Sequence, residues 1–385
     1  MEARPLLVVI DARCILPQED GLGAYARNLL THLQPIASSH RFLVLVDPKS
    51  LDEVRRLLDS DRFELLPLDA PSMKFSQHWR VPRLVRERWP DVYHYLAHDM
   101  PVVRSVPSVL TFQDLNFLRF PDYYARWSWV KRSYSAAVCA RAVRAARRIL
   151  VPSESTRGFL VERWPGASSR VAVVPYGVDP RFRAPIEPAR LPETLARYRL
   201  APHAYFLFVV TDRPHKNLSR LKAAYLSLPA EVREQFPLAL AGSHSYGGLD
   251  PRDPPGVVRL GYVASGDLPL LYAGSYAVVI PSLDEGFGLP ALEAMACGAA
   301  VLVSKGTALE EVVRLAGMSF DPYSIDSIRG ALLSLVSNPE RRSTLSLSAR
   351  ERSKWFDFGE TARRTLAVYE QVAGGSRPKG GSLSP

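Results

Sequence analysis

The chain has 385 residues, 47% of them hydrophobic and 23% charged, which is a composition typical of a globular protein with two domains of ordinary size. No apolar run approaches the roughly 20 residues that a membrane-spanning helix needs. Three cysteines without metal-ligand spacing and a net charge of +10 predict a cytoplasmic protein with an anionic partner. Charge alone leaves open nucleotide diphosphates, acidic lipid headgroups and nucleic acid.

Apolar runs alternate with helical patterns through the first half of the chain. The first run, Leu6–Ile10, is followed at once by Asp11 and Arg13, so it predicts a buried strand rather than a signal peptide. A glycine loop at 21–23 leads into a helix that ends at Leu33. The further predicted elements are strands at 42–46, 109–112, 149–151 and 171–174 and a long helix at 127–147. This alternation is typical of βαβ units with a mostly parallel sheet.

The same alternation restarts after a proline-rich segment, 181–202, which we interpret as a linker. Beyond it, strands are predicted at 205–210, 238–241, 278–280 and 300–303, and helices at 218–228, 290–296 and 360–372. We therefore expect two Rossmann-like, doubly wound α/β domains, at 1–180 and 203–354, with a ligand cleft between the carboxyl edges of their sheets. The Gly/Ser/Pro-rich end, 373–385, is expected to be disordered.

The most informative motif is a glycine-rich loop between a predicted strand and a predicted helix, Pro281–Glu293. It holds Glu285 in the loop and Glu293 in the first helical turn, so both side chains can reach a ligand at the helix N-terminus. Carboxylates suit sugar and ribose hydroxyls because they accept two hydrogen bonds at once. Either glutamate alone is also consistent with a solvated loop residue or a helix-dipole contact. The pair, with the glycine loop between them, favours a binding site.

A basic turn, Thr211–Asn217, lies between another predicted strand and helix. Lys216, together with Arg213, would stand at a helix N-terminus capped by Asn217, where backbone N–H groups and a lysine can bind phosphate. The alternative is an exposed basic turn without a ligand.

A third motif, the glycine turn at 20–25, is also consistent with an ordinary strand-to-helix turn. Together, however, the three motifs resemble the signature of the family-four retaining glycosyltransferases, which have the GT-B fold. The resemblance covers nearly the whole chain. Its matching segments occur in the family's order, at 21–25, 149–154, 174–179, 214–217, 261–263 and 281–293.

The resemblance implies a role for each matching residue. Glu285 would face the transferred sugar, Glu293 would bind the donor ribose, and Lys216 with Arg213 would neutralise the diphosphate. The other donor-binding residues that it implies are Gly21, Gly23, Val263, Phe287, Gly288 and Leu289. The last helix, at 355–372, would cross back onto the N-terminal domain.

The chain departs from the family's pattern at three positions. Gln113 stands where the family commonly has a histidine against the transferred sugar, Val210 stands for a glycine, and His215 stands for an arginine. Glutamine can hydrogen-bond a sugar hydroxyl but cannot carry a proton. We place Gln113 with Glu285 and Lys216 as the candidate catalytic residues. A catalytically weak GT-B subunit that supports a partner transferase is the alternative, while an epimerase or phosphorylase fits the glutamate spacing less well.

The expected activity is a metal-independent, retaining transfer of a hexose from a GDP- or UDP-sugar, without a cofactor. The acceptor would be a carbohydrate, a lipid-linked saccharide or a natural product, held near His94, His98 and Asp114. Both histidines are also consistent with structural roles. The pattern resembles bacterial, mannosyltransferase-like enzymes of envelope polysaccharide and glycolipid synthesis. The Asp-x-Asp motif at 59–61 lies in a polar stretch, and we interpret it as a solvated turn rather than a metal site.

The segment 126–148 carries seven basic residues and no acidic one, together with Trp127, Trp129 and Tyr134. A basic helix with aromatic residues can lie on an anionic membrane surface, which would make the protein peripheral at the inner face of the membrane. The alternative is a solvated helix face with the aromatic side chains in the core. The chain shows no recognised nucleic-acid-binding module, so we expect no nucleic-acid partner.

Overall fold

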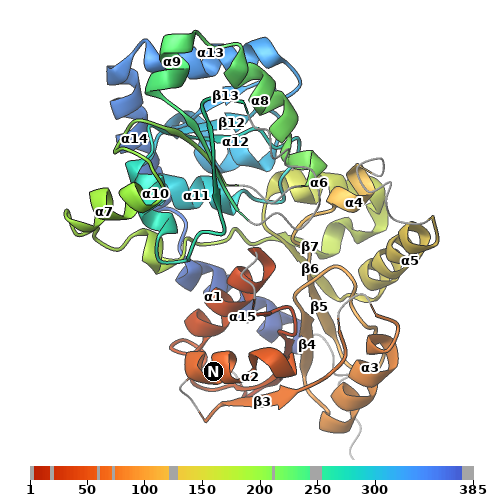
Figure 1. Cartoon of the computed structure of the whole chain (residues 1–385). Helices are drawn as coiled ribbons and strands as arrows, with labels where there is room; N and C mark the ends of the chain where they lie inside the picture. Colours follow the sequence, from red (N-terminus) through yellow and green to blue (C-terminus); the bar gives the residue numbers. More distant parts are fainter. Residues whose placement is uncertain are drawn as a thin grey trace, which may run out of the picture. The chain divides into compact units, whose positions relative to one another are not determined.

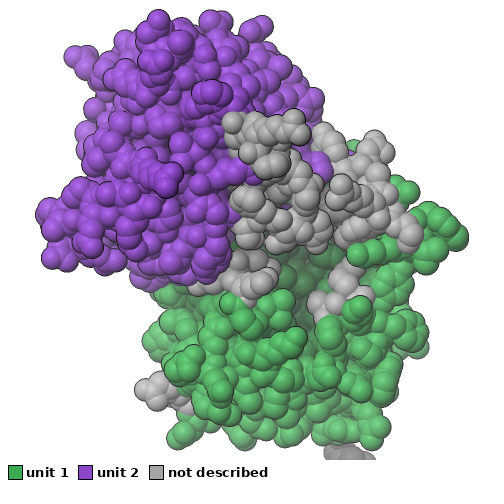
Figure 2. Space-filling model, in the orientation of Figure 1, with its two compact units in different colours: residues 1–118, 125–177, 358–385 green, residues 119–124, 178–357 purple. Residues whose placement is uncertain are grey.

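The chain forms two units, each built around one parallel β-sheet. The computed structural model describes residues 4–17, 21–58, 61–71, 74–120, 129–209, 213–242 and 254–374. Unit 1 takes residues 1–118, 125–177 and 358–385, and unit 2 takes residues 119–124 and 178–357 (Figure 2). The C-terminal helix therefore belongs to the same unit as the N-terminal strand.

The sheet of unit 1 has seven strands in the order β3-β2-β1-β4-β5-β6-β7, all of them parallel (Figure 1). The strands are β1 (Leu7–Asp11), β2 (Arg41–Val46), β3 (Phe63–Pro67), β4 (Val92–Tyr95), β5 (Ser108–Thr111), β6 (Arg148–Val151) and β7 (Val171–Val173). The helices are α1 (Gly21–Leu33), α2 (Leu51–Leu57), α3 (Gln77–Arg88), α4 (Asn116–Arg119, ending in the first residue of unit 2), α5 (Trp129–Ala145), α6 (Glu154–Arg163) and α15 (Phe358–Gly374). The strand order reverses between β1 and β4, and ligands of doubly wound sheets bind beside that switch point.

The sheet of unit 2 repeats this topology with six parallel strands in the order β10-β9-β8-β11-β12-β13. The strands are β8 (Phe206–Val209), β9 (Leu238–Ala241), β10 (Val257–Gly261), β11 (Ala277–Ile280), β12 (Val301–Ser304) and β13 (Met318–Phe320). The helices are α7 (Arg190–Arg197), α8 (Leu218–Leu226), α9 (Ala230–Gln235), α10 (Leu268–Gly274), α11 (Leu289–Ala296), α12 (Ala308–Val313), α13 (Ile325–Val336) and α14 (Pro339–Ser353). Its switch point lies between β8 and β11. The two Rossmann-like α/β domains predicted from the sequence are confirmed.

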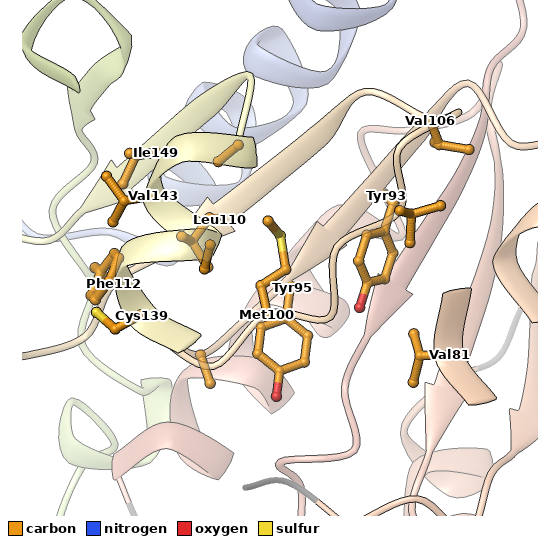
Figure 3. Close-up of a cluster of buried hydrophobic side chains, with 14 of the residues drawn as sticks. Val81, Tyr93, Tyr95, Met100, Val106, Leu110, Phe112, Cys139, Val143 and Ile149 are labelled. Atoms are coloured by element: carbon orange, nitrogen blue, oxygen red, sulfur yellow. The ribbon is translucent and has the colours of Figure 1, made fainter. Parts of the chain in front are cut away.

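An apolar cluster in unit 1 holds α3 and α5 against the sheet (Figure 3). It joins Tyr95, Leu110 and Ile149 of the strands to Val81 of α3 and Cys139 and Val143 of α5. Burying a large apolar side chain contributes about 1.5–3 kcal/mol, so this cluster fixes both helices firmly. In unit 2, an equivalent cluster packs α8 and α13 on the sheet.

The C-terminal helix α15 packs against α1 and reaches the central strands of unit 1. Its Tyr369 is fully buried, and its Thr361 Oγ1 donates a hydrogen bond of 2.8 Å to the carbonyl of Pro175. These contacts tie the end of the chain to the unit in which the chain begins.

The largest difference from the predicted elements lies in the predicted linker, 181–202. It contains helix α7, whose Leu195 is fully buried and which packs against α10. Pro185 and Pro188 lie before α7, Pro192 lies in its first turn, where proline is tolerated, and Pro202 follows the helix. Strands β3, β4, β10 and β13 are also absent from the predicted elements. Glu64 and His94 interrupt the apolar runs of β3 and β4.

Candidate active site

Two of the predicted motifs follow neighbouring strands of unit 2. The basic turn 213–217 comes after β8, and the glutamate loop 281–288 comes after β11, on either side of the switch point of the sheet. The carboxyl ends of parallel strands lie at the same edge, so the strand order brings the two motifs together. The backbone N–H of Leu283 donates to the carbonyl of His215 at 2.7 Å, which links them directly.

Lys216 and Glu285 form the charged centre of this site. The Lys216 ammonium donates to Glu285 Oε1 at 2.6 Å, and Ser282 Oγ donates to the same oxygen at 2.6 Å. The Lys216 side chain is only 16% exposed and the Glu285 side chain 11%. Glu285 is therefore not the solvated loop residue of the alternative interpretation, and Lys216 is not an exposed turn residue.

The surroundings of Glu285 keep it ionised. Burial by itself would raise the pKa of this carboxyl, but the charges of Lys216 and His215 and the hydrogen bonds from Lys216 and Ser282 hold its pKa below the ordinary value. A ligand can replace this contact with its own: its phosphate can pair with the Lys216 ammonium, and its hydroxyl groups can donate to the Glu285 carboxylate.

Asn217 contributes differently from its predicted capping role. It precedes α8 in the left-handed conformation, with φ of 61°, and makes no side-chain cap hydrogen bond. Instead its Nδ2 donates to the carbonyls of Pro281 (3.0 Å) and Pro322 (2.7 Å). Asn217 thus ties the basic turn to the start of the glutamate loop, a long-range contact that a local capping pattern does not reveal.

Gly288 sets the start of α11 with a backbone conformation that favours glycine. Its φ is +105°, and a Cβ at this position would lie 2.5 Å from Leu309 Cδ2. Glycine offers no side-chain cap, Pro290 has no N–H, and the Ala291 N–H donates to the carbonyl of Gly288 at 3.0 Å, so the N–H of Leu289 is the first-turn donor that no side chain caps. Phe287 beside it is buried and its ring packs against Phe356 at a centroid distance of 5.7 Å. The helix N-terminus therefore presents the Leu289 N–H and the positive end of the helix dipole close in sequence to Glu285.

Glu293 lies in the second turn of α11, not in the first turn as predicted, because the helix begins at Leu289. Its Oε2 accepts a hydrogen bond of 3.1 Å from the hydroxyl of Tyr272 on α10. Burial and the Glu293 charge raise the pKa of Tyr272 well above its usual value, so this hydroxyl remains a donor. Tyr272 is a site residue that the motifs do not reveal, since it lies in another helix, 21 positions away in sequence.

Arg213 and Val263 are two further predicted donor-binding residues of unit 2, and neither is buried. Arg213 is exposed at the start of the short helical turn 214–216, and the half-buried Val263 follows β10. Val210, which stands for a family glycine, lies outside the described residues together with Thr211 and Asp212.

In unit 1, the predicted glycine loop is helical. Gly21 is the first residue of α1 and Gly23 is buried in its first turn, while Asp20 lies outside the described residues. Neither glycine has a positive φ. The motif therefore supplies helix N-terminal N–H groups rather than a loop that approaches a phosphate.

Gln113 and Asp114 follow β5, at the carboxyl edge of the unit 1 sheet. The Gln113 Nε2 is buried, and among the described residues it has no hydrogen-bond partner. Asp114 Oδ1 accepts from the backbone N–H of Asn116 at 3.2 Å. An unsatisfied buried amide donor is costly unless a ligand pairs with it, so Gln113 is a candidate ligand contact.

His94 and His98 have different environments. His94 lies in strand β4, not in a loop, and is fully buried, with its ring nitrogens 2.6 Å from Tyr369 Oη and 2.8 Å from Thr111 Oγ1. Burial lowers the pKa of His94 to about 3. His94 is thus a structural residue and its predicted acceptor role is wrong. His98 is half-buried in the loop after β4, with its ring stacked near Phe112.

On the basic helix α5, the described aromatic side chains are not fully in the core, where the solvated-face interpretation had placed them. Trp129 is 72% exposed, so it is not in the core, whereas Tyr134 is half-buried and its hydroxyl lies 3.0 Å from Nε2 of His78 on α3. Arg141 and Arg144 are exposed on α5. Arg148 lies in β6 and donates to the carbonyl of Ser169, so it is not part of the helix face. Arg126 and Trp127 lie outside the described residues.

Among the described residues, no group of three or more histidine, cysteine, aspartate and glutamate side chains is arranged to hold a metal ion. Asp61 is exposed in a turn before β3, while Asp59 and Ser60 lie outside the described ranges, as does the chain end at 375–385. In the described part of the chain, no helix combines the length and the apolar character needed to cross a bilayer.

Comparison with known proteins matches both units. The model described as "Glycosyltransferase Family 4" matches residues 20–182, and the model described as "Glycosyl transferases group 1" matches residues 199–352. The O-antigen chain mannosyltransferase B of Escherichia coli is 31% identical over 290 residues, covering 72% of this chain and 74% of that protein. The E. coli serotype-specific mannosyltransferase WbdA is 29% identical over 241 residues, or 59% of this chain and 29% of WbdA. The crystal structure of Anabaena HepE in complex with UDP-glucose has a TM-score of 0.75 at 16% identity, covering 95% of this chain and 100% of that one.

Proposed function

Because the chain belongs to glycosyltransferase family 4, with the GT-B fold, we propose that it is a retaining, metal-independent hexosyltransferase. The donor is a nucleotide-diphosphate sugar, and the acceptor is a carbohydrate or a glycolipid. Mannose is the sugar that we favour, because the two E. coli relatives are named as mannosyltransferases. The proposed donors are both UDP- and GDP-linked sugars. The UDP-linked sugars are among them because the HepE structure contains UDP-glucose.

The buried Lys216–Glu285 pair beside the N-terminus of α11 is the observation that carries this proposal. The pair, the Leu289 N–H after Gly288, and Glu293, which the Tyr272 hydroxyl orients, match the charged and hydroxyl groups of a nucleotide-sugar. The ammonium and the helix N-terminus attract the diphosphate, and the two carboxylates accept hydrogen bonds from sugar and ribose hydroxyls. A purely structural ion pair does not require the uncapped helix beside it.

In the proposed reaction, the bond between the sugar C1 and the diphosphate oxygen breaks, and its electron pair leaves with the nucleotide diphosphate. The acceptor hydroxyl forms its bond to C1 on the same face, and its proton passes to the departing phosphate oxygen. Lys216, Arg213 and the N-terminus of α11 with its Leu289 N–H stabilise the negative charge that develops on the leaving group, so no metal ion is needed for that purpose. The oxocarbenium-like sugar resembles that of glycosidases.

Gln113 supplies the buried Nε2–H donor described above, which we assign to a hydroxyl of one of the two substrates. It cannot act as a base, and the mechanism does not ask it to, because the leaving phosphate takes the acceptor proton. We expect Gln113→Ala to reduce turnover while leaving nucleotide binding by unit 2 unchanged.

A nucleotide-release assay tests the proposal directly. The protein is incubated with GDP- and UDP-linked hexoses and a set of mannoside acceptors, with and without EDTA. We expect one donor family to release nucleotide, equally with EDTA, and Lys216→Ala to lower the rate by about 10²–10³-fold. Lys354→Ala is the matched control, because Lys354 pairs with Glu351 on the surface at 2.7 Å. Proton NMR of the product reports the anomeric configuration.

A separate experimental result would refute each part of the proposal, namely retention, metal independence and the role of Lys216. Inversion at C1 would refute retention, and loss of activity with EDTA would refute metal independence. Equal activity of Lys216→Ala and Lys354→Ala would remove Lys216 from the leaving-group role. If the wild-type protein releases no nucleotide from any donor, the interpretation as a supporting subunit replaces this proposal.

We also propose that unit 1 contacts an anionic membrane through a surface formed by α3 and α5. The two helices meet at His78 and Tyr134. On α3 and the residues before it, Phe75 is 78% and Trp79 54% exposed, and on α5 Trp129 is 72% exposed. Exposed cations accompany these rings, namely Arg80, Arg83, Lys131, Arg141 and Arg144. Exposed aromatic rings and cations on two helices in contact suit the headgroup region of an acidic bilayer.

Sedimentation with phosphatidylglycerol vesicles, compared with phosphatidylcholine vesicles, tests this surface. Neutralising Arg141 and Arg144 together should cost about 2 kcal/mol, or roughly 30-fold in vesicle affinity, because each basic residue near the surface contributes about 1 kcal/mol. Trp129→Ala should also weaken binding, whereas Trp355→Ala, which removes an 80% exposed tryptophan of unit 2, should not. The proposed membrane contact is refuted if the wild-type protein does not sediment with phosphatidylglycerol vesicles, or if Trp129→Ala and Trp355→Ala have the same vesicle affinity.

A further inference from the structure

A pocket of about 300 Å³ lies in unit 2 at the amino edge of its sheet, opposite the edge that carries the glutamate loop. His203 and Phe236 line it just before β8 and β9, Tyr276 lines it just before β11, and Arg342 and Ser343 line it from α14. Its volume is at the lower end of the range of about 300–1,000 Å³ found for small-molecule sites. None of the proposed donor-binding residues lines this pocket.

Among the residues that the structure describes, the half-buried cation Arg342 has no carboxylate partner. Its Nε donates to the carbonyl of Tyr276 at 2.9 Å, and its Nη2 lies 3.0 Å from His203 Nδ1 and 3.5 Å from the carbonyl of Ser275. Its guanidinium also lies over the Tyr276 ring, 4.9 Å from the centroid. In the described part of the chain, every one of these partners is uncharged or a backbone group. Partly buried charges are usually paired, so the guanidinium has the capacity to bind an anion.

His203 is held beside Arg342 by an unusual backbone conformation. Its φ is +56°, a region that residues other than glycine seldom adopt, and its N–H donates to the carbonyl of Gly274 at 2.6 Å. His203 Nδ1 lies 3.0 Å from Arg342 Nη2 and 3.4 Å from the carbonyl of Ser275. Because a guanidinium can only donate, we assign Nδ1 as the acceptor in the shorter contact, with the ring proton on Nε2. The imidazole thus adds a second N–H donor to the lining of the pocket.

The remaining wall of the pocket is aromatic. The rings of Phe236 and Tyr276 lie with their centroids 4.4 Å apart, and the hydroxyl of Tyr276 is used in a hydrogen bond to the carbonyl of Leu335 at 2.9 Å. These rings therefore offer apolar surface rather than polar groups. Arg342 also stands in the first turns of α14, where the helix N-terminus adds positive potential.

We propose that this pocket is a second ligand site of unit 2, which binds a small organic anion. Its carboxylate or phosphate pairs with Arg342 and His203, and its apolar part lies against Phe236 and Tyr276. The proposal does not depend on the glycosyltransferase activity. It places a ligand beside the amino end of β11, the strand whose carboxyl end leads into the glutamate loop.

Ligand-observed NMR with benzoate, phenyl phosphate and inorganic phosphate, at constant ionic strength, tests the site on the full chain. We expect benzoate or phenyl phosphate to bind several-fold more tightly than inorganic phosphate, because only the organic anions can use the aromatic wall. Comparison of benzoate with phenyl phosphate identifies the preferred head group. Arg342→Gln should weaken binding at least about tenfold. Arg341→Gln is the matched control, since Arg341 is exposed on the same helix turn and bonds Ser334.

Two further variants keep the test decisive. Ser343→Trp fills the pocket without removing any hydrogen bond of Arg342, so it should abolish binding even if Arg342→Gln does not fold. Lys216→Ala should leave binding unchanged. The proposal is overturned if none of the three anions binds, if Arg341→Gln weakens binding as much as Arg342→Gln, or if Lys216→Ala abolishes it, since the anion would then occupy the donor site.

Discussion

Replacing Lys216 with methionine removes the ammonium and leaves the Glu285 carboxylate mostly buried beside an apolar side chain. The exposed fractions of the two side chains, 16% and 11%, place this pair with buried ion pairs rather than surface ones. Removing one partner of a buried pair costs about 3–5 kcal/mol, whereas exposed pairs contribute about 0–1 kcal/mol. We therefore expect Lys216→Met to lower the free energy of unfolding of unit 2 by about 3–5 kcal/mol at neutral pH.

The pH dependence of this loss follows from the pKa of Glu285. In the wild-type protein that pKa is lower than its ordinary value of 4.5, so the carboxylate contributes stability above pH 4.5 that disappears as the pH falls through the folded-state pKa. Without Lys216, the charge of His215 and the hydrogen bond from Ser282 still lower the pKa, but burial is the largest single influence, so we expect the pKa to rise above 4.5. The variant then loses stability as the pH rises from 4.5 through its own folded-state pKa. The difference between the two proteins should therefore be small in acid and largest at neutral pH.

Urea unfolding, monitored by hydrogen exchange of peptides from α8 and α11, measures this loss of stability within unit 2. Adding Glu285→Gln to Lys216→Met should recover about 2–3 kcal/mol, because the unpaired charge is gone. Lys354→Met, in the exposed pair with Glu351, should cost less than about 1 kcal/mol. A loss below about 1 kcal/mol for Lys216→Met, or a loss that does not change with pH, would show that Glu285 is solvated and would refute the reasoning.

Three further predictions concern single positions. Gly288→Ala should destabilise unit 2 by at least about 1–2 kcal/mol, because its φ of +105° disfavours a side chain and the new Cβ meets Leu309; a urea melt with unchanged midpoint would contradict this. Tyr272→Phe should cost about 1.5–3 kcal/mol and weaken nucleotide-sugar binding measured by calorimetry, since Glu293 loses its orienting donor. Because the pKa of His94 is lowered to about 3, folding should lose about 1.4 kcal/mol for each pH unit below 6.5, and His94→Gln should flatten that slope in melts at stepped pH.

The sequence by itself determined the fold class and the order of the site motifs. Alternating strand and helix patterns are local, and a glycine-rich turn between a strand and a helix can be recognised without knowing where other parts of the chain lie. Strands such as β8, β9 and β11 are short apolar runs bounded by turns, so they were found within two residues of their observed ends. The glutamate loop and the basic turn were located for the same reason.

Local sequence patterns did not predict the first residue of α11 or the side-chain contacts at the start of α8. The predicted first-turn position of Glu293 was wrong because α11 begins at Leu289, and that start depends on Gly288 packing against Leu309 of a different helix. Likewise, Asn217 turned its side chain to the carbonyls of Pro281 and Pro322 rather than capping its own helix. Both outcomes depend on residues that are distant in sequence.

Only the tertiary structure decided which charges meet. Lys216 and Glu285 are 69 positions apart, and the strand order that places β8 beside β11 brings them into contact. His94 became a structural residue because α15, from the other end of the chain, covers it with Tyr369, 275 positions away. The Arg342 pocket is likewise assembled from segments that precede three different strands. Burial and pairing of charged groups depend on such long-range neighbours, and the periodicity of a single segment carries no information about them.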